Sequence, residues 1–321
     1  MYRIVRLLAQ ALVVALAAGS AFAVDYPTRS VKWVVPYTPA GTTDTLARIM
    51  AQWLSDKMGQ QFIIENKPGG GNNIGTEFAL HSPPDGYTML LVNPANGINE
   101  TLYRHLNFDI VKDMAPVAGI VRSPNVMEVT NDFPAKTVQE FIDYCKKNPG
   151  KINMASSGSG TSVHMSGELF MMMTGCKMTH IPYKGAGPAL TDLIAGQVHV
   201  LFDNLPSSIG HIKGGRIRAL AVTTSEPSSA LPGIPTVAAT VPGYEASAWF
   251  GIGMPKGTPK EIVDKVNAEV QRALNDPGMV KKLEELGGTP LKGSAEDFGR
   301  VVQSEVDKWA KVVKASGATV E

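Results

Sequence analysis

The stretch VPYTPAGTTDTLAR, residues 35–48, leaves an apolar strand, crosses a loop of small residues and enters a helix. A second stretch of the same design, INMASSGSGTSVHM, occupies residues 152–165. Both loops keep the backbone accessible, and the first has no lysine or arginine before Arg48. Unpaired N–H groups at a helix N-terminus can bind an anion without a basic side chain. The two loops together predict one site for a small anion, although either loop alone is more typical of a capped turn.

The composition is that of a soluble globular protein. The chain has 321 residues, enough for one large or two ordinary domains, and is 44% hydrophobic and 18% charged. Thirty Lys and Arg against 29 Asp and Glu give a formal charge of +1. This balance argues against electrostatic binding to nucleic acid or to an anionic membrane surface. We therefore expect no nucleic-acid partner.

The N-terminus has the pattern of a secretory signal peptide. Arg3 and Arg6 precede the apolar run 7–18, and Ala21 and Ala23 are the small residues of a cleavage site. A membrane anchor is the alternative, but this run is about twelve residues long and a bilayer span needs about 20. We expect residues 1–23 to be removed by cleavage after Ala23, so that the mature protein lies outside the cytoplasm.

Strand and helix patterns alternate along the chain, which is typical of βα units with mostly parallel sheets. Branched and aromatic residues predict strands over 31–35, 62–65, 88–92, 115–120, 152–155, 199–202 and 218–222. Apolar periodicity predicts helices over 43–58, 74–81, 138–147, 163–174, 188–195 and 207–214. Two α/β lobes, each with one small-residue loop at the carboxyl ends of its strands, would hold a ligand in the crevice between them.

The last third of the chain is helical by pattern. Thr258 is a candidate N-cap with Glu261 three residues later, which predicts a helix over 259–274 that ends at 275–277. Ser294, with Asp297 in the capping-box position, predicts another helix.

Two extended segments are candidates for the crossings between lobes. VRSPNVMEVT, residues 121–130, and SAWFGIGMP, residues 247–255, are both interrupted by proline or glycine. We therefore expect residues 24–124 and 248–321 to form lobe 1 and residues 125–247 to form lobe 2.

Motifs for nucleotide and metal chemistry are incomplete. GSGTSV, residues 158–163, begins like a dinucleotide fingerprint but ends in valine, and Thr76 stands where a phosphate loop from Gly70 needs its lysine. The six histidines and two cysteines show no ligand spacing for a metal. We expect no cofactor and no metal.

An exported esterase is the main enzymatic alternative, with Ser157 or Ser159 as nucleophile and His164 as base. Neither serine has the glycine two positions earlier that a nucleophile elbow requires, and no third residue is identifiable as an orienter. We therefore expect no catalytic residue.

Cys145 and Cys176 leave two possibilities open. In an oxidising compartment they would close a loop of about thirty residues with a single disulfide. The alternative is two buried free thiols.

Segments in order along the chain resemble the substrate-binding proteins of tripartite tricarboxylate transporters, the Bug family of periplasmic receptors. They are YPTRSVKWVVPYTPAGTTDTLAR, IIENKPGGGNNIGTEFALHSPPDGYTMLL, ASSGSGTSVHMSGELF, HIPYKGAGPALTDLIAGQV and GMPKGTPKEIVDKVN, and the similarity covers about residues 26–315. The resemblance implies an α/β, two-lobed periplasmic-binding-protein fold of type II, a Venus flytrap with its ligand cleft between the lobes.

The same resemblance implies a periplasmic, non-enzymatic receptor, expected to be monomeric. It would capture a small organic carboxylate and deliver it to integral-membrane subunits of a tripartite transporter. A sensor that presents the closed form to a signalling protein is the other non-enzymatic alternative. The resemblance does not specify which carboxylate is bound.

The resemblance also implies ligand contacts on both loops. These fall on Tyr37, Ala40, Gly41, Thr42, Thr43 and Asp44 in the first loop, on Ser157, Gly158, Gly160 and Thr161 in the second, and on Asn93, Asn96 and Asp203 elsewhere in the cleft.

Some of these positions also have a structural interpretation. We favour helix capping for Asp44. Asp203 would contact an ammonium or hydroxyl of the solute, or accept backbone N–H groups across the cleft. Ala40 stands where the family often has a second glycine, and the segment PGGGNNIG, residues 68–75, is interpreted as a tight turn into a helix.

Overall fold

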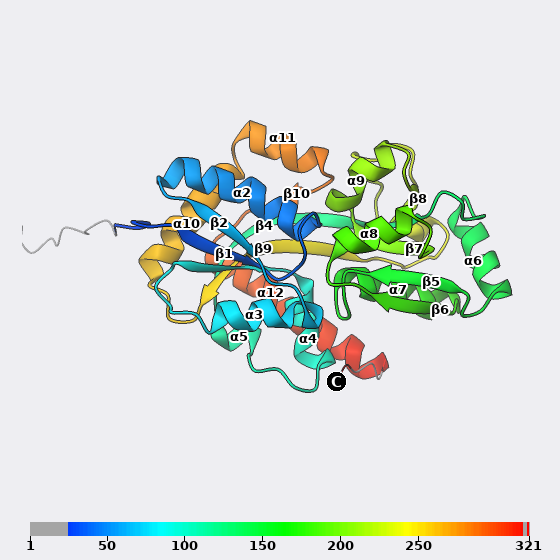
Figure 1. Cartoon of the computed structure of the whole chain (residues 1–321), viewed down its shortest axis with the longest axis horizontal. Coiled ribbons are helices and arrows are strands. Elements are labelled where there is room, and N and C mark those ends of the chain that lie inside the picture. The colour runs from blue at the N-terminus through cyan, green and yellow to red at the C-terminus, as the bar shows by residue number, and fades with distance from the viewer. Residues whose placement is uncertain (1–24, 317–319, 321) are drawn as a thin grey trace, which may run out of the picture.

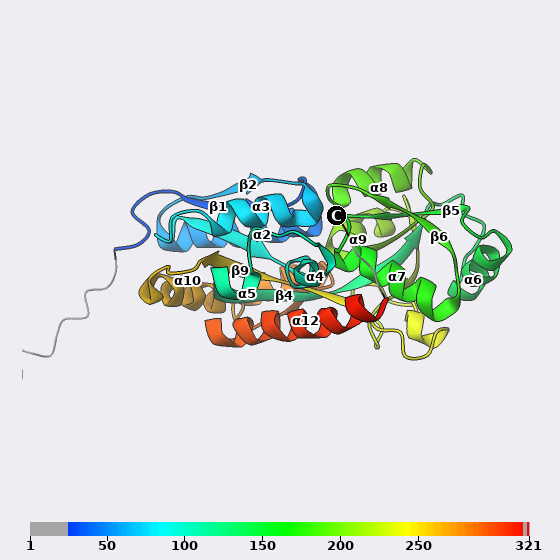
Figure 2. The ribbon, with the colours of Figure 1, turned by 90° about the horizontal axis from the view of Figure 1, so that it is seen from below.

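The computed structural model of the chain describes residues 25–316 and Val320, so the predicted signal peptide lies outside the described residues. The molecule is elongated, with two α/β parts side by side along its long axis (Figure 1). Long strands run through the middle and connect the two parts (Figure 2). The predicted α/β class is confirmed.

A single sheet with the strand order β2-β1-β3-β9-β4-β7-β5-β6 extends through both parts. Its centre is β4 (Met114–Val129). β4 pairs antiparallel with β9 (Ser247–Pro255) as far as Pro124, and with β7 (Val200–Asn204) from Asn125 onward. The partner of β4 therefore changes between Pro124 and Asn125. The lobe boundaries stay a prediction, because strand pairing shows where the sheet divides and not which segments move together.

We use the name lobe 1 for the part around β1–β3 and lobe 2 for the part around β5–β8. The other strands of lobe 1 are β1 (Val31–Val35), β2 (Phe62–Asn66), β3 (Thr88–Val92) and β10 (Thr289–Pro290). Those of lobe 2 are β5 (Ile152–Ser156), β6 (Met178–Pro182) and β8 (Arg218–Val222). Within each lobe, β1–β3 and β5–β7 pair in parallel, as βα units require.

The helices of lobe 1 are α2 (Thr42–Met58), α3 (Asn73–Leu80), α4 (Pro94–Leu102), α5 (Ile110–Asp113), α10 (Lys260–Ala273), α11 (Pro277–Glu285) and α12 (Ala295–Ser316). Those of lobe 2 are α6 (Val138–Lys147), α7 (Ser162–Thr174), α8 (Ala186–Ile194) and α9 (Leu205–Lys213). Short 3-10 turns occur at Gly70–Asn72 and Val237–Ala239. No helix within residues 25–316 is long and apolar enough to cross a bilayer.

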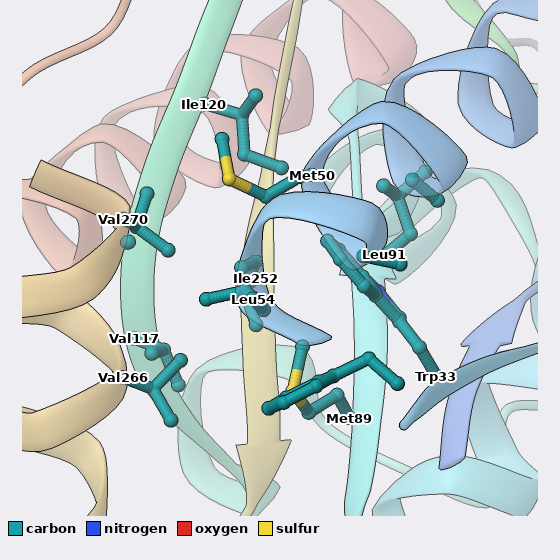
Figure 3. Close-up of a cluster of buried hydrophobic side chains, with 14 of the residues drawn as sticks. Trp33, Met50, Leu54, Met89, Leu91, Val117, Ile120, Ile252, Val266 and Val270 are labelled. Atoms are coloured by element: carbon teal, nitrogen blue, oxygen red, sulfur yellow. The ribbon is translucent and has the colours of Figure 1, made fainter. Parts of the chain in front are cut away.

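The core of lobe 1 lies on both faces of its sheet. Trp33 of β1 belongs to the same buried cluster as Met50 and Leu54 of α2 and Val266 of α10, on one face of the sheet (Figure 3). Val34, the next residue of the strand, belongs to the cluster on the other face. Helices cover both faces of the sheet, which explains why β1 is apolar at successive positions and does not alternate with polar residues.

The core of lobe 2 is aromatic on the face covered by α6 and α7. Phe141, Phe170 and Phe202 pack in one cluster with Cys145 and Cys176. Both cysteines are buried and unbonded in this structure, and their thiols interact with each other. The disulfide expected for an oxidising compartment stays a prediction.

The sequence prediction missed several elements, among them α4, α5, α11 and β6. Helix starts account for further differences. The N-cap of α10 is Pro259 and not Thr258, because the Thr258 hydroxyl donates to the Pro255 carbonyl oxygen at 2.8 Å. Asp276 and Pro277 end α10 as expected but also begin α11. The capping box of α12 is present as predicted, since Ser294 Oγ accepts from the Asp297 N–H at 3.1 Å.

Candidate functional site

Five helix N-termini converge on one small pocket between the lobes. α2 and α4 approach it from lobe 1, and α7, α8 and α9 approach it from lobe 2. The pocket has a volume of about 20 Å³ and is lined by Tyr37, Gly41, Thr42, Thr43, Asn93, Pro94, Ser157, Thr161, Ser162, Val163, Ala186, Asn204 and Phe250. None of these residues is charged, so the helix termini are the main source of positive potential in the pocket.

The first loop leaves the start of α2 open toward the pocket. Gly41 is the N-cap and has no side chain to cap the helix. The first backbone hydrogen bond of the helix runs from the Thr45 N–H to the Gly41 carbonyl oxygen at 3.0 Å. The N–H groups of Thr42 and Thr43 therefore belong to the unpaired first turn, and both residues line the pocket.

Asp44 does not line the pocket. Its carboxylate accepts two hydrogen bonds from Arg48, both at 2.9 Å, and one from the Ala40 N–H at 3.1 Å. Burial alone would raise the pKa of Asp44, but the hydrogen bonds from Arg48 and Asn66 outweigh it and hold the pKa below its usual value. Asp44 thus acts within lobe 1, and it neutralises the arginine closest in sequence to the loop.

Ala40 is exposed and lies outside the pocket lining. Its φ of 68° is left-handed, the conformation that glycine adopts without strain. The family's frequent glycine at this position therefore has a backbone explanation, and Ala40 keeps the turn at a cost in strain.

The start of α4 contributes Asn93 to the pocket, whereas Asn96 is buried behind it. The Asn93 side chain caps the helix by accepting from the Ala95 N–H at 3.0 Å, and Asn96 Oδ1 accepts from the Asn93 N–H at 2.9 Å. Tyr37 donates its hydroxyl to Asn93 Oδ1 at 3.3 Å. Asn93 Nδ2 is buried and has no hydrogen-bond partner. This lone donor lies in a residue that lines the pocket.

The second loop provides Ser157 and Thr161, while its glycines shape the turn. Thr161 donates its hydroxyl to the Gly158 carbonyl oxygen at 2.7 Å, and Oγ1 accepts from the His164 N–H at 3.2 Å. Gly158 and Gly160 have positive φ values of 132° and 82°, and neither lines the pocket. The loop therefore presents the start of α7 and not the glycine backbone itself.

Asp203 is fully buried and does not line the pocket. It accepts hydrogen bonds from Ser207 and from Ser208, the latter at 2.9 Å. Burial raises the pKa of Asp203 to about 6, although the serine hydroxyls oppose this shift. Asp203 is therefore placed behind Ser207, where it orients that hydroxyl.

Asn204 lines the pocket, and the sequence prediction missed it. Its Nδ2 donates to Asn125 Oδ1 at 2.7 Å and to Ser162 Oγ at 3.2 Å. The available signal was an asparagine two positions before Pro206, which is typical of a helix start.

Direct contacts close the pocket across the lobes. Thr42 donates its hydroxyl to Ser207 Oγ at 2.9 Å. The Thr38 N–H donates to the Lys184 carbonyl oxygen at 3.2 Å. Tyr103 donates its hydroxyl to the Ser159 carbonyl oxygen at 3.4 Å. The two lobes are thus in direct contact around the pocket.

The geometry gives the esterase alternative no support. His164 Nδ1 accepts from the Gly160 N–H at 3.2 Å, and Nε2 contacts Glu168 at 3.2 Å. Both imidazole nitrogens are therefore occupied, and neither has Ser157 or Ser159 as its partner. Within the part of the chain that the structure describes, no cluster of three or more His, Cys, Asp or Glu could hold a metal ion.

Residues 46–318 match the model of the tripartite tricarboxylate transporter family receptor. The chain belongs to this family. The protein BugT of Bordetella pertussis is 33% identical over 299 residues, which cover 92% of this chain and 92% of BugT. The resemblance inferred from the sequence is confirmed.

Solved structures of relatives agree closely with this fold. R. palustris Rpa4515 with adipate has a TM-score of 0.89 and 42% identity, covering 92% of this chain and 100% of that chain. The periplasmic binding protein BugD has a TM-score of 0.89 and 33% identity, with the same coverage. MatC from Rhodopseudomonas palustris with bound malate has a TM-score of 0.86 and 31% identity, covering 90% of this chain and 100% of that chain. The predicted two-lobed periplasmic-binding-protein fold is thereby confirmed.

Proposed function

We propose that this receptor binds a small organic carboxylate in the pocket between its lobes and, once closed, delivers it to integral-membrane subunits of a tripartite transporter. The observation that carries the proposal is the convergence of five helix N-termini on a pocket without a charged side chain. Such termini favour an anion and exclude a cation. A neutral sugar would gain little from them.

The expected affinity suits capture followed by release. A hydrogen bond to a charged group contributes about 1.5–3 kcal/mol, so three to five of them yield on the order of 5–10 kcal/mol before ordering costs. Micromolar binding requires about 8 kcal/mol. Backbone donors and hydroxyls alone thus suffice for binding that a transporter can reverse.

Relatives support the class of ligand and the compartment. Rpa4515 and MatC were solved with adipate and malate, which are both carboxylates, and BugD is a periplasmic binding protein. We infer that this protein is likewise periplasmic after cleavage behind Ala23, that it acts as a monomer, and that it returns its ligand chemically unchanged. Opening and closing would move residues 24–124 and 248–321 against residues 125–247.

A thermal-shift screen of the mature protein tests the proposal. Organic acids at concentrations far above their Kd are expected to raise the Tm by mass action, whereas neutral sugars of similar size are not. NMR of the recovered acid is expected to show no conversion. Stabilisation by a sugar but by no carboxylate would contradict the proposal, and conversion of the acid would favour an enzyme.

A further inference from the structure

A second, larger cavity adjoins the pocket. We call it the distal cavity; its volume is about 180 Å³ and its lining is Tyr37, Gly69, Gly70, Gly71, Asn72, Tyr103, Ser157, Gly158, Ser159, Pro182, Tyr183 and Lys184. Tyr37 and Ser157 line both spaces, so the two spaces are neighbours within the same cleft.

The two spaces differ in size, with about 20 Å³ in the pocket and about 180 Å³ in the distal cavity. The narrow pocket suits the carboxylate end of an organic acid. The carbon chain of an acid bound in this way continues past Tyr37 and Ser157 into the distal cavity.

The distal cavity contains an unpaired donor. Asn72 is 1% exposed, and its Nδ2 has no hydrogen-bond partner. Burial raises the pKa of Tyr37, and the nearby Asn72 side chain opposes this rise, although Asn72 Nδ2 meets no acceptor by geometric hydrogen-bond criteria. A buried donor without an acceptor is destabilising, so such a group calls for an explanation. An acceptor on a bound solute provides one.

The cavity also has a positively charged side chain at its rim. Lys184 is exposed and is the single charged side chain in the lining. Among the described residues no carboxylate forms an ion pair with it. Its charge is therefore free to attract an anionic group in the cavity.

The two buried side-chain amides without a hydrogen-bond partner lie in different parts of the cleft. Asn93 Nδ2 belongs to the lining of the pocket, and Asn72 Nδ2 to that of the distal cavity. Tyr37 lines both spaces, and its hydroxyl is a neutral donor at pH 7 because burial raises its pKa well above the usual value. One carboxylate in each space would give both amides an acceptor.

We propose that the distal cavity binds a second anionic group of the solute, with Asn72 and Lys184 as specificity-determining residues, so that the receptor selects a dicarboxylate over a monocarboxylate of the same length. This inference rests on the proposed function, because it assigns the first carboxylate to the pocket. It also assigns a binding role to residues 69–72, which the sequence suggested to be a structural turn.

Calorimetric titration with matched acids tests this inference. The probes are succinate against butanoate and adipate against hexanoate. For at least one pair, the dicarboxylate is expected to bind about tenfold or more tightly, since a charged hydrogen-bonding group adds that much in a partly buried site. Lys184→Gln and Asn72→Gly are each expected to weaken the dicarboxylate about 3–10-fold and to leave the monocarboxylate unchanged. Glycine is chosen at position 72 because its φ is 90°.

Lys177→Gln is the matched control, because Lys177 is an exposed lysine of lobe 2 outside the lining. Its affinities are expected to equal those of the wild type. Equal binding of both acids in every pair, or equal losses for both acids in the variants, would overturn this inference but leave the proposed function standing. Failure of every acid to bind would overturn both.

Discussion

Thr42 of α2 and Ser207 of α9 are joined across the lobes by a hydrogen bond of 2.9 Å between their hydroxyls. The Ser207 N–H also donates to Thr42 Oγ1, at 3.1 Å. Behind them, Asp203 accepts from the Ser207 hydroxyl. Thr42 is the first residue of the helix whose N-terminus faces the pocket, so one of the contacts between the lobes lies directly beside the proposed carboxylate. We expect this residue pair to contribute to the coupling between closure and ligand binding.

Ser207→Ala is expected to weaken carboxylate binding about 3–10-fold, mainly through faster dissociation, because one interlobe hydrogen bond of about 1 kcal/mol is lost. Ser208→Ala is the matched control. Ser208 bonds Glu128 and Asp203 within lobe 2, so its loss is expected to lower the Tm without changing affinity. Stopped-flow kinetics and calorimetry measure the effects. Equal affinity losses for both variants would contradict the role of the Thr42 contact.

Gly187→Ala is expected to oppose closure. A Cβ atom on Gly187 of α8 would lie 2.7 Å from the Pro39 carbonyl oxygen of lobe 1. Affinity for the acid is expected to fall at least tenfold, while the unliganded protein keeps its Tm because alanine favours helix. Gly210→Ala in α9 is the control, since a Cβ there meets nothing within 4 Å. Unchanged affinity in Gly187→Ala would show that this contact does not limit closure.

Ala40→Gly is expected to stabilise the protein by about 0.5–1 kcal/mol. The φ of 68° strains alanine by about 1–2 kcal/mol, and the added freedom of glycine in the unfolded chain offsets part of the gain. Ala268→Gly, at an exposed helical position of α10, is expected to destabilise by about 1 kcal/mol instead. Urea unfolding compares the two. Destabilisation by both substitutions would argue against strain at Ala40.

Acid is expected to destabilise the fold through His180. Its ring stacks on His164 with centroids 3.9 Å apart, and Nε2 lies 2.6 Å from Ser156 Oγ beneath the second loop. Burial and the neighbouring His164 lower the pKa of His180 to about 4, against the opposing charge of Glu168. The neutral form is thus favoured in the folded state, and protonation is favoured in the unfolded state.

The contribution of neutral His180 to the free energy of unfolding is therefore complete above pH 6.5, and it is lost as the pH falls toward 4. It amounts to at most about 3 kcal/mol, and less because the ring is partly exposed. Unfolding free energies between pH 4.5 and 7.5 are expected to fall less steeply in His180→Gln than in the wild type. The exposed His81→Gln serves as control. Parallel curves for wild type and His180→Gln would contradict this assignment.

Local sequence patterns predicted best those helices and strands in which all residues favour the same type of secondary structure. β1, β3 and α6 have the predicted bounds, because branched residues in the strands and an amphipathic pattern in α6 leave little ambiguity. β4 is longer than its predicted range 115–120, because Pro124 interrupts the apolar pattern beyond that range. The sheet accommodates Pro116 with a shift of register beside it.

The site was harder to predict, because the two lobes form it together. A local signal marks the helix start at Asn204, but its place in the pocket and the cavity at Asn72 depend on contacts between segments distant in the chain. No local pattern contains those contacts. Conversely, Asp44 and Asn96 lie next to the pocket, but their side chains form hydrogen bonds within lobe 1. A sequence locates the loops, whereas only the packed helices show which polar groups stay unpaired.

The central claim is that backbone amides at helix N-termini hold the carboxylate without a basic side chain. A crystal structure of the mature protein with a bound organic acid tests it most directly. The account predicts carboxylate oxygens about 2.7–3.2 Å from backbone nitrogens at the starts of α2 and α7, near Thr42 and Ser162. A carboxylate in the pocket held by an arginine or lysine, with those amides unengaged, would contradict it.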